Sequence, residues 1–294
     1  MTFENYVIEN NLGTIESGYS FKELTTIGCG GRIKTLYTPN SIESLCTAFK
    51  YVNDISIKYF ILGNGSNILA SDSDFMGVVF NLRKMPSDYV IIDDILDCSA
   101  FYSTSKLAYE LANEEKGDLS FLCGIPGLIG GAIYNNCGAY NDNIQNHLID
   151  VTYINSNGNI LTIKNEDCDF DYRRSIFHYF GCIIISARFK ISKFDSKKII
   201  ARRMNERRLA QPLECKNMGS IFKNNKLVKA WEVIDALGMR GYHINDAAIS
   251  SKHANFIINS GNAKSSDIIS LINLIQKRSM LELGIKLVCE ITII

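Results

Sequence analysis

Residues 121–140 read FLCGIPGLIGGAIYNNCGAY, with five glycines, one proline and no charged side chain. Glycine loses more conformational freedom on folding than any other residue, so this density is typical of backbone that turns tightly or lies close against another group. The apolar residues between the glycines indicate burial. Two interpretations are open: a glycine-rich turn packed in a core, or a loop whose backbone N–H groups bind a large phosphorylated or planar ligand.

A second glycine-containing loop lies upstream, where residues 59–69 read YFILGNGSNIL. Its apolar, strand-like start leads into the loop Gly63-Asn64-Gly65-Ser66-Asn67. Consecutive backbone amides and short side-chain donors suit a pyrophosphate. The loop is neither a dinucleotide fingerprint nor a P-loop, because no G-x-G-x-x-G opens a helix and no Lys-Ser/Thr follows the glycines. Asn-Gly is equally typical of a hairpin turn, so both interpretations are open here too.

Composition bounds the class of protein. The chain has 294 residues, enough for sizeable cores and about two domains. Its 31 basic and 31 acidic side chains give no net charge, so no long-range electrostatic attraction favours binding to nucleic acid or to an anionic membrane. Neither partner is expected. The basic cluster at 197–208 has a helical composition and is interpreted as a solvated face.

The cysteines and the N-terminus indicate the compartment. The nine cysteines are odd in number and lack C-x-x-C or C-x-x-H spacing, so neither a disulfide framework nor a metal site is expected. The N-terminal residues MTFENYVIENNLG lack the regions of a signal peptide, and no apolar run reaches the roughly 18 residues of a membrane helix. We therefore expect a soluble, cytoplasmic protein with reduced thiols.

Hydrophobic periodicity predicts an α+β fold, because strands and helices alternate without a regular βαβ pattern. Strands are predicted at Arg32–Tyr37, Tyr59–Leu62, Gly77–Leu82, Tyr89–Leu96, Ile149–Ile154, Ile160–Ile163, Cys182–Ile191, Phe256–Asn259 and Ile285–Ile293. Helices are predicted at Ser41–Val52, Tyr102–Glu114, Lys229–Leu237 and Ser265–Leu283, with a basic helix running to Gln211. The chain turns polar near Lys193–Lys198, which places a domain boundary around residue 195.

Three polar residues stand in contexts that need an explanation. Ser220 lies in a Gly-Ser turn before an apolar run, Arg173 lies in YRRS, and Glu290 interrupts an apolar strand, where a carboxylate is costly to bury. Each also has a plain interpretation: a turn serine, a surface ion pair, and a residue on a solvated strand face. His253, in SSKHANF, is as compatible with a structural role as with a ligand-facing one.

Taken together, the order and spacing of six segments closely resemble the UDP-N-acetylenolpyruvoylglucosamine reductase family, also called the UDP-N-acetylmuramate dehydrogenases, of bacterial cell-wall synthesis. The segments are LGNGSNIL (62–69), GIPGLIGGAIYNNCGAY (124–140), YRRS (172–175), QP followed by GSIFKN (211–224), SSKHANFIIN (250–259) and GIKLVCEI (284–291). Residues 20–45 also resemble the family's entry strand and first flavin-contacting loop. The chain is similar to the shorter of the family's two types, which lacks a tyrosine-bearing insertion.

The resemblance implies a domain organisation and a cofactor. After an N-terminal segment at 1–19, it implies an FAD-binding domain of the p-cresol methylhydroxylase/vanillyl-alcohol oxidase type over 20–195, with two subdomains split near 70–75. A smaller α+β substrate-binding domain would follow at 196–294. FAD would be held noncovalently, since no histidine lies in either loop. The implied FAD contacts are Gly63, Asn64, Gly65, Ser66, Asn67, Gly124, Ile125, Pro126, Gly127, Gly130 and Gly131.

The resemblance also implies a reaction, in which NADPH reduces FAD and the enolpyruvyl ether of UDP-N-acetylglucosamine then accepts a hydride. Ser220 matches the family's proton donor, and Arg173 and Glu290 match the pair associated with the enolate. Arg173 is preferred over Arg174 because the motif places arginine directly after tyrosine. Tyr172, Asn136, Lys223 and His253 are expected to bind substrate.

Two other functions stay open at this point. One is a flavin oxidase or dehydrogenase of the same superfamily with another substrate, which leaves the matched Ser220 and Glu290 unexplained. The other is a catalytically silent sensor of flavin or UDP-sugar, which predicts erosion of the three catalytic matches, and all three are present.

Overall fold

The computed structural model describes residues 1–225 and 227–294, which form two compact units. Unit 1 comprises Met1–Ser17, Thr35–Gly63 and Met76–Met204, and unit 2 comprises Gly18–Lys34, Asn64–Phe75 and Asn205–Ile294. The predicted division into an FAD-binding part at 20–195 and a substrate-binding part at 196–294 concerns what each part binds, and it stays a prediction.

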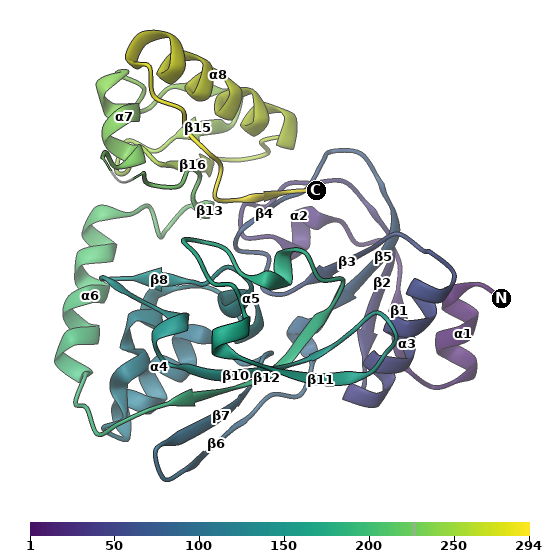
Figure 1. Cartoon of the computed structure of the whole chain (residues 1–294). Helices are drawn as coiled ribbons and strands as arrows, with labels where there is room; N and C mark the ends of the chain where they lie inside the picture. The colour runs from purple at the N-terminus through teal and green to yellow at the C-terminus, as the bar shows by residue number, and fades with distance from the viewer. Residues whose placement is uncertain (226) are drawn as a thin grey trace. The chain divides into compact units, whose positions relative to one another are not determined.

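Unit 1 begins with a four-stranded sheet of order β1-β2-β5-β3. Strand β1 runs antiparallel to β2, whereas β3 runs parallel to β5. Helix α3 follows β2 and leads into β3, and its N-terminus is capped by Ser41, which accepts a hydrogen bond from the Ser44 N–H. Figure 1 shows α1 beside α3. The elements are α1 (Phe3–Glu9), β1 (Gly13–Glu16), β2 (Ile33–Pro39), α3 (Ile42–Asp54), β3 (Tyr59–Leu62) and β5 (Phe75–Asn81).

Aromatic rings fill the space between this sheet and its helices. Tyr37 and Phe80 are fully buried, and their ring centroids lie 5.3 Å apart in an edge-to-face arrangement. Phe49, on the buried face of α3, lies 5.9 Å from Phe80. The Tyr37 hydroxyl donates to the carbonyl of Leu12 at 2.8 Å, so this buried polar group is satisfied. The apolar residues whose spacing of about 3.6 predicted α3, Phe49 among them, lie on the side of the helix that faces the core.

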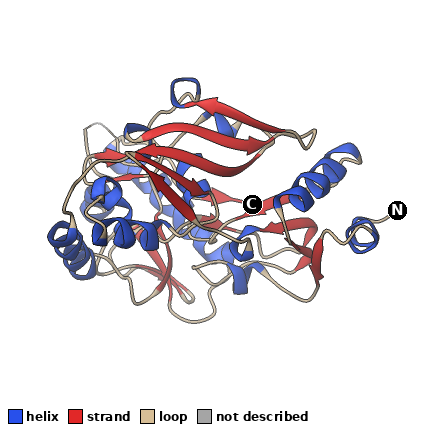
Figure 2. Cartoon of the chain, turned by 90° about the horizontal axis from the view of Figure 1, so that it is seen from below, coloured by secondary structure: helices blue, strands red, loops and turns tan. Residues whose placement is uncertain are grey.

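The second sheet of unit 1 is antiparallel and five-stranded, with the order β11-β10-β12-β7-β6. Figure 2 shows its strands side by side in red. Helix α5 packs on β7 and β12, and one continuous core joins both sheets of the unit. The elements are β6 (Tyr89–Ile92), β7 (Ile95–Ser99), α4 (Thr104–Asn113), α5 (Ile129–Tyr134), β8 (Gly138–Ala139), β9 (Asp142–Asn143), β10 (Leu148–Ile154), β11 (Ile160–Lys164), β12 (Ile183–Lys190) and the first half of α6 (Lys197–Ala210).

Unit 2 is built on a four-stranded sheet of order β13-β16-β15-β14, with α7 and α8 packed together beside it (Figure 1). A short parallel pair joins β17 to β4. Helix α8 ends at Gly284, which adopts φ +67° as a left-handed C-cap. The elements are α2 (Phe21–Leu24), β4 (Ile68–Leu69), β13 (Lys216–Ser220), α7 (Ala230–Ala236), β14 (His243–Ile244), β15 (Ala247–Ile249), β16 (Phe256–Asn259), α8 (Ser265–Leu283) and β17 (Thr292–Ile293).

The mixed helix and strand content confirms the α+β prediction, with two local corrections. The single strand predicted at Tyr89–Leu96 is a hairpin, because Asp93 turns the chain at φ +56° between β6 and β7. The strand predicted at Ile285–Ile293 is regular only at β17; before it, Cys289 forms an isolated bridge with Phe222. Among the described helices, none combines the length and the apolar character needed to cross a membrane.

Candidate functional site

The loop at 63–67 is held by its carbonyl groups. The Gly65 carbonyl accepts from the Thr26 N–H at 3.1 Å, and the Asn67 carbonyl accepts from the Thr292 N–H at 2.9 Å. Gly65 has φ +66°, and a Cβ there would lie 2.2 Å from the Leu24 carbonyl oxygen, so only glycine fits. Among the described residues no acceptor is bonded to the N–H groups of Gly65, Ser66 or Asn67, which suits them to phosphate oxygens.

Ser220 ends β13, where the strand is irregular. The register between β13 and β16 shifts between Asn217 and Ser220, which pairs with Phe256. Gly219 adopts φ +79° in this bulge, and its N–H donates to the Asn217 side chain at 3.0 Å. Bulges re-aim side chains next to them. Ser220 is half-buried.

Glu290 lies beside the strand that carries Ser220. Its N–H donates to the carbonyl of Ile221, the residue after Ser220, at 2.8 Å. Its own carbonyl accepts from the Asn67 side chain at 3.3 Å. Glu290 is half-buried, whereas Lys286 is exposed. Unit 2 therefore brings together the loop residue Asn67 and two of the three predicted catalytic residues.

Two predicted substrate-binding residues lie in the same unit. The Lys223 N–H donates to the Val288 carbonyl at 2.8 Å, which places Lys223 on the segment shared with Ser220 and Glu290. His253 lies in the turn before β16, where its Nδ1 accepts from the Asn255 N–H at 3.3 Å. Burial, and then the charge of Arg240, lower the pKa of His253.

In unit 1, the glycine-rich run lies across the end of β7. The Gly130 N–H donates to the Ala100 carbonyl at 2.8 Å, and the Ile129 N–H donates to the Tyr102 carbonyl at 2.9 Å. A Cβ added at Gly63 would be 3.7 Å from the Leu128 side chain, so the start of the 63–67 loop lies next to this run. Within unit 1, Gly63 therefore lies beside the glycine-rich run.

Arg173 occupies a strained turn. Asp171 and Arg174 exchange two backbone hydrogen bonds of 3.1 Å across Tyr172 and Arg173, and Arg173 has φ +56°, a conformation that side chains rarely adopt. Its guanidinium lies over the Tyr172 ring at 5.1 Å and donates to the Gly138 carbonyl at 2.9 Å. Such strain is often found at functional sites. Arg174 instead pairs with Asp169 at 3.4 Å.

Asn136 supports this turn. It is 4% exposed, and its amide nitrogen donates to the Asp171 carbonyl at 3.0 Å and to the Gln145 side chain at 3.2 Å. Its oxygen accepts from the Gln145 N–H at 3.3 Å. The structure thus gives Asn136 a role in holding the turn at Arg173, while substrate binding by Asn136 stays a prediction.

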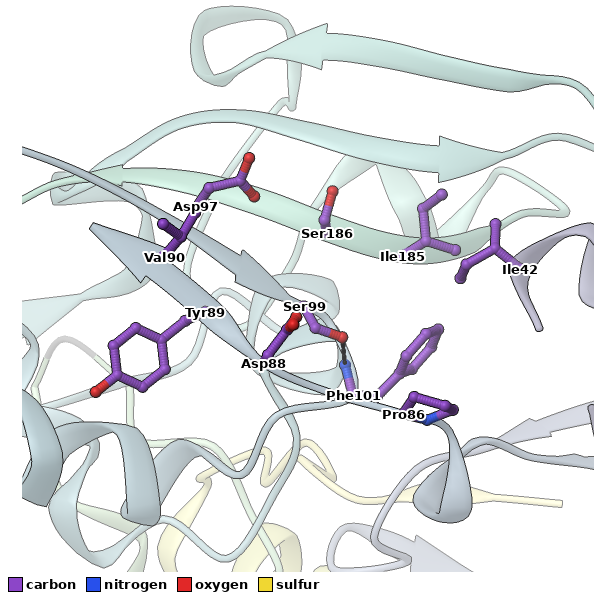
Figure 3. A pocket seen from close by; sticks show the side chains of 10 residues that line it. All are labelled: Ile42, Pro86, Asp88, Tyr89, Val90, Asp97, Ser99, Phe101, Ile185 and Ser186. Carbon is purple, nitrogen blue, oxygen red and sulfur yellow. Dashed lines mark hydrogen bonds between the residues drawn. The ribbon is translucent and has the colours of Figure 1, made fainter. Parts of the chain in front are cut away.

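A cavity of about 400 Å³ lies elsewhere in unit 1, on the face of the five-stranded sheet. Figure 3 shows Ser99 and Ser186 among the side chains that line it and the Phe101 ring beside Pro86. Its lining includes none of the residues predicted to bind FAD or substrate.

Sequence reasoning missed three supporting residues. Thr26 donates from its hydroxyl to the Asn217 carbonyl at 2.6 Å, next to its bond with Gly65. Asp72 accepts the N–H groups of Ser265 and Ser266 at the start of α8. Asn255 bonds the main chain of Phe222. All three side chains act on backbone far away in sequence, a pairing that no local pattern reports.

Comparison with known proteins agrees with this geometry. The family model described as the C-terminal domain of UDP-N-acetylenolpyruvoylglucosamine reductase matches residues 211–294, and an FAD binding domain model matches residues 33–164. The UDP-N-acetylenolpyruvoylglucosamine reductase of Carboxydothermus hydrogenoformans is 36% identical over 273 residues, covering 92% of this chain and 90% of its own. That of Clostridium novyi is 34% identical over 283 residues, covering 95% and 92%.

Solved structures give the same result. The crystal structure of UDP-N-acetylenolpyruvylglucosamine reductase from Thermus caldophilus matches with a TM-score of 0.80 and 30% identity, over 96% of this chain and 99% of that one. Berberine bridge enzyme from Eschscholzia californica matches with a TM-score of 0.51 at 15% identity, over 65% of this chain and 43% of that one, which concerns the fold alone. The fold is thus the FAD-binding domain of the p-cresol methylhydroxylase/vanillyl-alcohol oxidase type with a second, smaller domain. The chain belongs to the UDP-N-acetylenolpyruvoylglucosamine reductase family and is an FAD-containing oxidoreductase.

Proposed function

We propose that the chain reduces UDP-N-acetylenolpyruvoylglucosamine to UDP-N-acetylmuramate with NADPH as hydride donor. This reaction would serve peptidoglycan precursor synthesis in the cytoplasm. The observation that supports the proposal is the main-chain pairing of Glu290 with Ile221, because it brings residue 290 alongside the residue after Ser220. The main chain of Glu290 also accepts from the side chain of the loop residue Asn67.

The residues present fit a noncovalently held FAD. The N–H groups of Gly65, Ser66 and Asn67 would bind its phosphates, and the bare backbone at Gly131, where a Cβ would meet nothing within 4 Å, leaves room beside the glycine-rich run. When bound, FAD would supply hydride transfer between NADPH and the enolpyruvyl group. No histidine lies at 63–67 or 124–131 to attach the flavin.

The chain's own residues would handle charge and the proton. Hydride addition leaves negative charge on the adjoining carbon and its carboxylate, and the planar Arg173 guanidinium suits that carboxylate. The Ser220 hydroxyl would then donate its proton to the carbon, and Glu290 would hold the serine and the enolate in register. Lys223 and Tyr172 are proposed to bind the substrate, together with Asn136 and His253.

The test measures the stoichiometry between NADPH oxidised and enolpyruvyl substrate consumed. The purified protein should be yellow, release intact FAD on denaturation, and oxidise one NADPH for each enolpyruvyl group consumed. NADPH oxidation that needs dioxygen instead of the enolpyruvyl substrate would identify an oxidase. A colourless protein that does not take up FAD would contradict the proposal altogether.

A further inference from the structure

A buried amide holds the main chain next to Ser220. Asn255 is 3% exposed, and its side chain bonds both polar groups of Phe222. The Phe222 N–H donates to Asn255 Oδ1 at 3.0 Å, and Asn255 Nδ2 donates to the Phe222 carbonyl at 2.8 Å. The Asn255 carbonyl also accepts from the Ile221 N–H at 2.9 Å. One residue thus satisfies three backbone groups of a two-residue segment.

The opposite side of that segment faces the last stretch of the chain. The Ile221 carbonyl accepts the Glu290 N–H, and the Lys223 N–H donates to the Val288 carbonyl, both at 2.8 Å. Residues 221–223 therefore lie between Asn255 on one side and residues 288–290 on the other. Any shift of this segment moves Ser220 relative to Glu290.

The strand ladder alone does not fix this segment. The β13–β16 register breaks between Asn217 and Ser220, and Gly219 adopts φ +79° there, with nothing within 4 Å of the position a Cβ would take. Such an irregularity disrupts the ladder locally and leaves the extra residue unpaired. Beyond the irregularity, the side chain of Asn255 bonds the N–H and the carbonyl of Phe222.

We propose that Asn255 is a positioning residue for the second half of the reaction, which sets the Ser220 hydroxyl against the carbon that receives the proton. The inference rests on the proposed function. An asparagine that only filled space would be replaceable by an apolar side chain, whereas here truncation leaves the buried N–H and C=O of Phe222 without partners. A displacement of about 1 Å at a reacting group costs on the order of a hundredfold in rate.

The experiment measures the two half-reactions by anaerobic stopped flow in Asn255→Ala and in the size-matched Asn255→Asp. Flavin reduction by NADPH should stay within about twofold of the unsubstituted enzyme, and reoxidation by the enolpyruvyl substrate should slow about 10- to 100-fold in Asn255→Ala. Asn255→Asp keeps the acceptor for the Phe222 N–H but not the donor, so its reoxidation rate should be intermediate. The flavin absorbance spectrum should be unchanged in both variants.

Ser279→Ala is the matched control. Ser279 is fully buried in α8 and donates to the Ile285 carbonyl at 2.6 Å, so its loss also leaves a buried carbonyl unsatisfied. It should lower the melting temperature without separating the half-reactions. If Asn255→Ala slowed both half-reactions equally, or if Ser279→Ala also slowed reoxidation alone, Asn255 would be a residue that only stabilises the fold, and the proposal would be wrong.

A double variant shows whether Asn255 acts through Ser220. If it does, adding Asn255→Ala to Ser220→Ala should slow reoxidation by less than about threefold, because the effects of residues that act as a unit do not add. Additive slowing would overturn the inference. If the unsubstituted, NADPH-reduced enzyme were not reoxidised by the substrate at all, the proposed function itself would fail, which is a different result.

Discussion

Asp72 gives the sharpest prediction about stability, because its carboxylate holds the start of α8 to the segment that carries the 63–67 loop. Oδ1 accepts from the Ser265 N–H at 2.8 Å, and Oδ2 accepts from the Ser266 N–H at 2.9 Å. Those N–H groups lie in the first turn of a 19-residue helix and have no partner within the helix. The change to make is Asp72→Ala.

The magnitude follows from the two bonds and the helix dipole. A capping side chain contributes about 0.5–2 kcal/mol to stability, and a negative charge near a helix N-terminus contributes about 0.3–1 kcal/mol. Asp72 is exposed, so water recovers part of the loss. We therefore expect Asp72→Ala to lower the free energy of unfolding by about 1–2 kcal/mol, and Asp72→Asn by about half of that.

The pH dependence follows from the pKa of Asp72. Burial opposes ionisation, but the N–H groups of Ser266 and Ser265 outweigh it and lower the pKa of this carboxyl. A group with a lowered folded pKa adds stability that is complete above its unfolded pKa, about 3.9, and is lost as the pH falls through the folded pKa. The difference in free energy of unfolding between the unsubstituted protein and Asp72→Ala should thus be constant from pH 7 to about 5 and shrink below about pH 4.

Urea unfolding of the FAD-loaded protein at several pH values measures this gap. Asp94→Ala is the control, since Asp94 is also exposed but lies in the turn between β6 and β7. If Asp72→Ala were no less stable than Asp94→Ala at pH 7, the capping interaction would contribute nothing. A gap that grew as the pH fell would contradict the sign of the pKa shift.

Two further predictions concern the site. Arg173→Ala should lower kcat by at least about a hundredfold. Arg174→Ala breaks a half-exposed ion pair with Asp169 and should change steady-state rates less than about threefold. Equal effects of the two substitutions would contradict the assignment of Arg173 as the catalytic arginine. Gly65→Ala should weaken FAD retention, measured by flavin fluorescence after dialysis, because its Cβ would meet the Leu24 carbonyl at 2.2 Å; full retention would show that the loop relaxes freely.

Much of the fold could be predicted because local patterns decide it. Helix α8 begins and ends where its serines and Gly284 predict, and β16 has its predicted bounds. The single strand predicted at Tyr89–Leu96 was wrong because apolar residues stand on both sides of Asp93 and Asp94, so the run was interpreted as continuous. The strand predicted at Ile285–Ile293 was too long, because its mostly apolar residues form, within the described part of the chain, an isolated bridge at Cys289 and then β17.

The sequence could point to candidate site residues, whose roles stay predictions, but not to the side chains that hold their backbone in place. Ser220, Glu290 and Asn67 lie in motifs that the sequence displays, and the structure places these three residues close together in unit 2. Asn255 and Asp72 were missed because each bonds backbone more than thirty residues away. Those pairings depend on register and on loop path, which emerge only when the sheet and α8 have formed.

The most direct test of the whole account is the reoxidation of the NADPH-reduced enzyme by UDP-N-acetylenolpyruvoylglucosamine, followed by anaerobic stopped flow in the unsubstituted protein and in Ser220→Ala. Both proteins should be reduced by NADPH at similar rates. The substrate should reoxidise the unsubstituted enzyme, and reoxidation of Ser220→Ala should be slower by about a hundred- to ten-thousand-fold. Equal reoxidation rates, or equal slowing of both half-reactions, would contradict the assignment of Ser220 as the proton donor.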